Sequence, residues 1–111
     1  ANGDMVGHTG VYEAAVLAVE HMDKCLSKIY SKVTELGGVL IIIADHGNCD
    51  MMWDSNHNPV TSHTTNPVPC IITKEGITLK DGKLADVAPT MISLLGLDVP
   101  EEMTGDILIN E

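Results

Sequence analysis

Three places in the sequence carry residue types that bind metal ions or transfer protons. Asp45 and His46 are adjacent and directly follow a continuous apolar run. Asp4 and His8 stand four residues apart near the start of the chain, and His63 lies in a later polar stretch. A carboxylate and an imidazole at the tip of a buried strand are either metal ligands or an acid–base pair. We therefore treat these five residues as one candidate site.

The mixture of donor atoms narrows the choice of metal. Aspartate oxygens combined with neutral imidazoles suit manganese, zinc, cobalt or iron better than magnesium or calcium, which prefer all-oxygen shells. The alternative is structural, because a single histidine is more often a surface or hydrogen-bonded residue than a ligand. His21 and His57 are interpreted as structural. Spacing alone leaves the metal site and the structural interpretation equally open.

The apolar pattern predicts the elements that position these residues. Apolar residues recur every three or four positions across residues 11–33, which predicts one long helix with a buried stripe. We expect Thr9 to cap this helix and Gly37-Gly38 to end it. The β-branched run at residues 39–44 is typical of a strand buried on both faces of a parallel sheet. Residues 45–66 are predicted to form a long loop.

The second half of the sequence predicts shorter elements. Residues 68–73 are expected to form another core strand, and residues 77–79 and 83–84 a small edge hairpin. Residues 86–95 are predicted to form a helix that Gly96 ends, followed by a brief strand at residues 107–109. These elements together predict an α/β fold, with a mostly parallel sheet sandwiched by helices.

Composition limits the possible partners. Sixteen acidic residues against six lysines, with no arginine, give a formal net charge of −10, which repels nucleic acid and anionic membranes. Anionic substrates are repelled too, so phosphate chemistry would need positive charge from metal ions or from protein outside this chain. The three cysteines have no CxxC spacing and are expected to be reduced, as in the cytoplasm. No apolar run approaches the roughly 20 residues of a membrane span.

Five segments, in order and through nearly the whole chain, form one set: DMVGHTG at 4–10, ADHGN at 44–48, SHTTNPVP at 62–69, DGKLADVAPT at 81–90 and EMTG at 102–105. In this set the chain resembles the cofactor-independent phosphoglycerate mutases of the alkaline phosphatase superfamily. The resemblance implies that residues 1–111 are the C-terminal portion of the metal-binding, phosphatase-like domain. It also implies an N-terminal portion and an inserted substrate-binding domain that this chain lacks.

The resemblance further implies two divalent ions, manganese first, with magnesium, cobalt or zinc as alternatives. Asp4, His8 and His63 would hold one ion, and Asp45 and His46 the other. The family's nucleophilic serine and a further aspartate come from the N-terminal portion, so no catalytic nucleophile is expected here. The intact enzyme would be a cytoplasmic, monomeric glycolytic enzyme that interconverts 2-phosphoglycerate and 3-phosphoglycerate through a phosphoserine, and this chain alone would be inactive.

Some features depart from the family or leave alternatives. The family often has Pro-His-Thr before the ligand histidine, whereas this chain has Pro59-Val60-Thr61, which puts a minor substrate contact in doubt. The sequence also begins at Ala1 without an initiating methionine, from which we expect a cut piece. The alternatives are another phosphotransferase or phosphatase of the superfamily, such as a phosphopentomutase, and a non-catalytic metal-binding α/β module.

Overall fold

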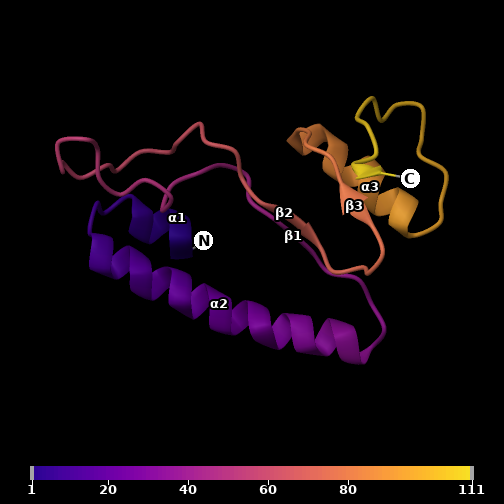
Figure 1. Ribbon diagram of the computed structural model, residues 1–111, viewed down its shortest axis with the longest axis horizontal. Helices are drawn as coiled ribbons and strands as arrows, with labels where there is room; N and C mark the ends of the chain where they lie inside the picture. The colour runs from indigo at the N-terminus through magenta and orange to yellow at the C-terminus, as the bar shows by residue number, and fades with distance from the viewer. Residues whose placement is uncertain (1, 111) are drawn as a thin grey trace. The chain divides into compact units, whose positions relative to one another are not determined.

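The chain folds into two compact units, Ala1–Thr73 and Lys74–Glu111, each with its own small sheet. The structure is a computed structural model and describes residues 2–110 (Figure 1). Within that range no helix has the length and apolar character needed to cross a membrane. The candidate residues all belong to the first unit.

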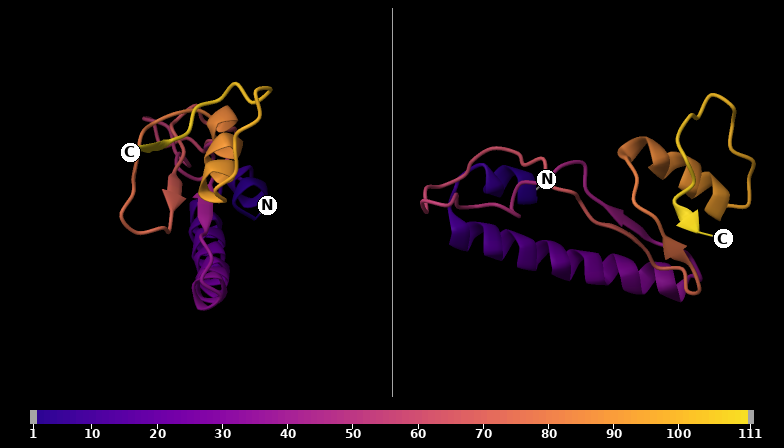
Figure 2. Two further views of the ribbon diagram at one scale, coloured as in Figure 1. Left: turned by 90° about the vertical axis from the view of Figure 1, so that its right-hand side faces the viewer. Right: turned by 45° about the horizontal axis from the view of Figure 1, so that its top comes forward.

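Two helices open the first unit. Helix α1 spans Asn2–Gly7 and lies alongside the first turns of α2, Tyr12–Glu35 (Figures 1 and 2). The long helix was predicted, but Thr9 is not its cap, because α2 starts after Val11 and the Thr9 hydroxyl instead accepts a hydrogen bond from the Val11 amide, 3.2 Å away. The helix ends as predicted before Gly37, which has a φ of 71°.

The predicted buried stripe of α2 is only partly buried. Only Ala15 and Ala18 are buried on this helix, whereas Val19, Met22 and Ile29 are 43%, 38% and 52% exposed. Periodicity correctly identified which residues share a face. It does not determine what packs against that face, and among the described helices and strands α1 is the main one that contacts α2.

The sheet of the first unit corrects the predicted fold class. Strand β1, Ile41–Ile43, pairs with β2, Cys70–Ile72, and the two run antiparallel, with Ile42 opposite Ile71. The connection between them, residues 44–69, contains no helix and doubles back (Figure 1). A parallel pair needs a crossover connection, so this geometry gives an antiparallel pair. The prediction of a mostly parallel sheet sandwiched by helices was therefore wrong for this chain, although helices and strands are both present.

The strands are also shorter and less buried than predicted. Ile43 at the end of β1 is 44% exposed, and Ile71 in the middle of β2 is 50% exposed. A β-branched apolar run indicates strand formation and a tendency to be buried, but it carries no information about the partner strand or the covering layers.

The second unit is a small helix-and-hairpin assembly. Strand β3, Thr78–Leu79, pairs antiparallel with β4, Ile109–Asn110. Between these strands in the sequence are the 3₁₀ turn η1, Leu84–Asp86, and helix α3, Val87–Leu94 (Figure 2). As predicted, the chain leaves helix α3 just before Gly96, which has a φ of 72°. The predicted hairpin between residues 77–79 and 83–84 was wrong, because residue 84 begins η1 and the partner of β3 lies at the other end of the unit.

A buried polar network holds the second unit together. The Asp86 carboxylate accepts hydrogen bonds from the backbone amides of Lys83 and Asp106, each 2.8 Å long. The amide of Lys83, followed by that of Asp106, holds the pKa of Asp86 below its usual value. The Thr90 hydroxyl donates to the Asp86 carbonyl at 2.7 Å and accepts from the Leu108 amide at 2.9 Å. The segment at residues 81–90 thus has a structural role in the fold.

Candidate metal centre

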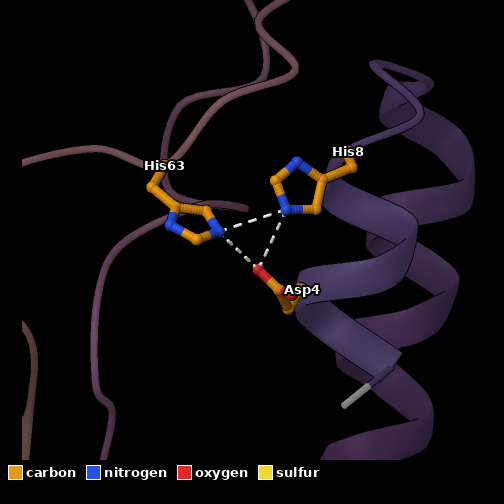
Figure 3. Close-up of side chains that lie close together, drawn as sticks. All are labelled: Asp4, His8 and His63. Carbon is orange, nitrogen blue, oxygen red and sulfur yellow. Dashed lines mark hydrogen bonds and ion pairs between the residues drawn. The ribbon is translucent and has the colours of Figure 1, made fainter.

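Three of the predicted residues form a compact group of donor atoms. Asp4 lies on α1, His8 follows its last turn, and His63 comes from the connection between β1 and β2 (Figure 3). The Asp4 Oδ1 atom lies 2.9 Å from His63 Nε2 and 3.2 Å from His8 Nε2, and the two Nε2 atoms are 3.1 Å apart. One carboxylate oxygen and two imidazole nitrogens therefore point at a common centre.

The dimensions of this triangle match those of one face of a metal coordination shell. Bonds of about 2.0–2.2 Å to nitrogen or oxygen, at octahedral or tetrahedral angles, place neighbouring ligand atoms about 2.8–3.6 Å apart. All three distances in the group lie inside that range. The donor set also suits a transition ion rather than calcium, since two of the three donors are nitrogens. The residues present therefore fit a divalent transition ion.

Backbone carbonyls set the orientation of two imidazoles. The Nδ1 atom of His8 lies 2.6 Å from the carbonyl oxygen of Thr61, and Nδ1 of His46 lies 3.2 Å from that of Gly47. A carbonyl only accepts hydrogen bonds, so Nδ1 is the donor in each pair, and Nε2 is the ring nitrogen that faces the group. A hydrogen bond from the opposite ring nitrogen to a carbonyl is the usual arrangement behind a metal-bound histidine.

Asp45 and His46 lie beside the group without completing a second one. The Nε2 atom of His46 is 3.6 Å from Asp45 Oδ1 and 3.6 Å from Asp4 Oδ1, and its ring stacks on that of His63 with centroids 3.5 Å apart. The Asp45 side chain is 84% exposed. These two residues offer one oxygen and one nitrogen, which is a partial ligand set. The chain leaves strand geometry after Ile43, so both adjacent side chains reach this region.

The position of His63 depends on contacts of its neighbours. Thr64 donates its amide to the Gly47 carbonyl at 2.9 Å, which places His63 next to His46. The Asp50 carboxylate accepts from the Thr64 hydroxyl at 2.9 Å and from the Asn66 amide at 2.6 Å. The hydrogen bond from Asn66, followed by that from Thr64, holds the pKa of Asp50 below its usual value. Sequence reasoning assigned no role to Asp50, and its spacing carried no signal that singled it out.

Asn48 is the second residue that sequence reasoning missed. Its Nδ2 atom lies 3.1 Å from both the carbonyl oxygen and Oδ1 of Asp4, and this hydrogen bond is the largest cause of a lowered Asp4 pKa. The only sequence signal was its place directly after Asp-His-Gly. The neighbouring Cys49 thiol donates to the Gly3 carbonyl at 3.1 Å, and burial raises its pKa. Asn48 and Cys49 therefore attach the connection between β1 and β2 to helix α1 by hydrogen bonds.

Comparison with known proteins places the chain in a protein superfamily. Residues 1–99 match the profile of the Metalloenzyme superfamily, and the chain belongs to that superfamily. Within it, the chain is 54% identical over 111 residues to the 2,3-bisphosphoglycerate-independent phosphoglycerate mutase of Staphylococcus saprophyticus and 51% identical over 121 residues to that of a Synechococcus strain. The resemblance stated from the sequence motifs is thus confirmed.

A solved structure extends the match to three dimensions. The crystal structures of Leishmania mexicana phosphoglycerate mutase at low cobalt concentration include a chain that superposes with a TM-score of 0.83 at 38% identity, over 97% of the present chain. The present chain covers 23% of that chain and 22% of the Staphylococcus saprophyticus protein. It therefore corresponds to less than a quarter of the relatives it matches.

Proposed function

We propose that residues 1–111 form the C-terminal, metal-ligand-bearing portion of a 2,3-bisphosphoglycerate-independent phosphoglycerate mutase. The whole enzyme would interconvert 2-phosphoglycerate and 3-phosphoglycerate in glycolysis. The observation that carries this proposal is the triangle formed by Asp4, His8 and His63, whose dimensions suit one divalent ion. The high identity to phosphoglycerate mutases supports this assignment over a phosphopentomutase or a non-catalytic module.

The residues divide between two ions. Asp4, His8 and His63 would hold the first ion, while Asp45 and His46 would contribute to the second. Manganese is the preferred ion, and cobalt is the alternative, supported by the similarity to a Leishmania mexicana enzyme crystallised at low cobalt concentration. Two such ions lower the pKa of a serine nucleophile and neutralise charge on a phosphoryl group in transfer. The first site offers three donors from this chain and the second only two, so the first should be the tighter site.

This chain alone should not turn over phosphoglycerate. None of its five serines matches the nucleophile motif of the family, and a nucleophile held beside the ions is essential to this chemistry. The sequence has no arginine and a net charge of −10, so an anionic substrate meets repulsion except near bound ions. The proposal includes a cytoplasmic, monomeric enzyme whose positive substrate contacts lie outside these 111 residues.

A metal titration tests the ligand assignment. Manganese binding is measured for the wild-type chain, for His63→Ala and for His21→Ala. The last is a matched control, because His21 is exposed on α2 and its ring has one side-chain hydrogen bond among residues 2–110, to Cys25 Sγ at 3.7 Å. We expect His63→Ala to weaken binding strongly and His21→Ala to leave it unchanged. Equal affinities for His63→Ala and the wild type would exclude His63 as a ligand.

An activity assay tests the remaining part of the proposal. The purified chain with saturating manganese should show no interconversion of the two phosphoglycerates, and activity should appear only when the N-terminal remainder of the enzyme is added. Turnover by the chain alone would contradict the proposal that the nucleophile lies elsewhere.

A further inference from the structure

Asn48 is almost fully buried and contacts Asp4 twice. Its residue is 6% exposed, and each hydrogen of its Nδ2 group has one acceptor, the carbonyl oxygen and the Oδ1 atom of Asp4, both 3.1 Å away. The amide therefore links the carboxylate of Asp4 to the backbone of the same residue. This pair of hydrogen bonds selects one side-chain conformation of Asp4.

The conformation that Asn48 selects is the one that faces the histidines. The Asp4 side chain is 47% exposed, and an aspartate with that much freedom samples several rotamers when nothing holds it. In the selected rotamer Oδ1 lies 2.9 Å from His63 Nε2 and 3.2 Å from His8 Nε2. Ordering of the ligand then occurs on folding rather than on ion binding, which strengthens binding by preorganisation.

Gly7 provides the space that the Asn48 amide occupies. A Cβ atom on residue 7 would lie 2.4 Å from Asn48 Oδ1, 2.6 Å from Cγ and 2.9 Å from Nδ2, so any larger residue displaces the amide. Gly7 is the last residue of α1 and does not have a positive φ, so the backbone itself does not require glycine. The glycine is therefore explained by the neighbouring amide.

We propose that Asn48 is a positioning residue of the metal centre, held in place through Gly7, that fixes the Asp4 carboxylate toward His8 and His63. This inference rests on the proposed metal-binding function. Asn48 Oδ1 is buried with no hydrogen-bond partner among residues 2–110, so both of its side-chain hydrogen bonds serve Asp4. Partners of this kind change metal affinity by about 10- to 100-fold when they are removed.

A double-mutant cycle with cobalt tests the proposal on the full 111-residue chain. Co²⁺ binding is followed by visible absorption for the wild type, Asn48→Ala, Gly7→Ala, the double variant and the control His21→Ala. Each single substitution at residues 7 and 48 should weaken Co²⁺ binding about 10- to 100-fold. The double variant should bind no more weakly than Asn48→Ala, because the new methyl group then enters vacated space. In the metal-free state it should melt no lower than Asn48→Ala, since all the atoms that a Cβ on residue 7 would meet belong to the Asn48 amide.

The outcomes separate the two proposals. Absence of Co²⁺ binding by the wild type would overturn the proposed metal site and this inference with it. Binding by the wild type together with affinity within twofold for Asn48→Ala would overturn only the role of Asn48. Full additivity of the two substitutions would overturn the part assigned to Gly7. Gly7→Ala keeps the test decisive if Asn48→Ala does not fold, because it displaces the amide without deleting it.

Discussion

Replacement of Gly47 by alanine should weaken metal binding by moving His63 away from Asp4. A Cβ atom on residue 47 would lie 2.0 Å from Thr64 Oγ1 and 2.8 Å from Asp50 Oδ1, whereas non-bonded heavy atoms rest at about 3.5 Å. Thr64 must therefore retreat by more than about 1 Å. Because His63 is the preceding residue, its Nε2 atom moves with it and leaves the range in which one ion reaches all three donors.

The magnitude follows from the cost of overpacking. The metal-free chain relieves the new contact by releasing Thr64 from Gly47, at the expense of one backbone hydrogen bond of 2.9 Å. Ion binding needs the released segment to return, so the overpacking cost of about 1–3 kcal/mol appears in the affinity. That cost corresponds to about 5- to 150-fold weaker binding.

Calorimetric titration with manganese measures this effect. Gly38→Ala is the matched control, because a Cβ atom there lies far from the site and meets only Cγ1 of Val33, at 3.1 Å, and that residue's carbonyl oxygen, at 3.4 Å. The control should bind manganese like the wild type. Affinity of Gly47→Ala within twofold of the wild type would refute the reasoning that the Gly47–Thr64 contact positions His63.

Two further predictions concern stability and pH. Thr90→Val keeps the shape of a buried side chain but leaves the Leu108 amide without its acceptor, so the second unit should lose about 1–3 kcal/mol of stability. Amide hydrogen exchange at Leu108 should accelerate in this variant. It should not accelerate in Thr90→Ser, which keeps the hydroxyl. Folding lowers the pKa of Asp4 from 3.8, so as the pH falls this carboxylate takes up a proton in the unfolded state before it does so in the folded state. The free energy of unfolding of the metal-free chain therefore decreases as the pH drops from just above 3.8 toward the folded pKa. Asp4→Asn should make this acid-induced loss shallower in urea unfolding at pH 2 to 6, and an unchanged pH dependence would contradict the role of that carboxylate.

The long helix was predictable because its signals are local. Residues 11–33 carry the helical period over many turns, and Gly37 supplies the stop signal. Strand-to-loop junctions and the motifs predicted that Asp4, His8, Asp45, His46 and His63 converge. In the structure the ligand atoms of Asp4, His8 and His63 lie within 4.8 Å of one another. That these residues hold an ion stays a prediction.

The strand partners were not predictable because pairing is a non-local property. The run at residues 39–44 indicates a strand, but its direction relative to residues 70–72 depends on how a 26-residue connection folds back. The partner of β3 likewise lies some 30 residues away, beyond the turn signal of Asp81-Gly82. Asn48 and Asp50 act through contacts with distant segments, which no periodicity or spacing reveals.

The most direct test of the metal centre is imidazole ¹⁵N spectroscopy of the full chain during titration with Zn²⁺, a diamagnetic probe. We predict that the Nε2 resonances of His8 and His63 shift together up to one equivalent of zinc, and that His46 responds only to further zinc. Nδ1 of His8 should keep its proton, which is hydrogen-bonded to the Thr61 carbonyl. His21 and His57 should stay unchanged. Equal responses from all five histidines, or no shift of Nε2 in His8 and His63, would contradict the claim that Asp4, His8 and His63 hold an ion.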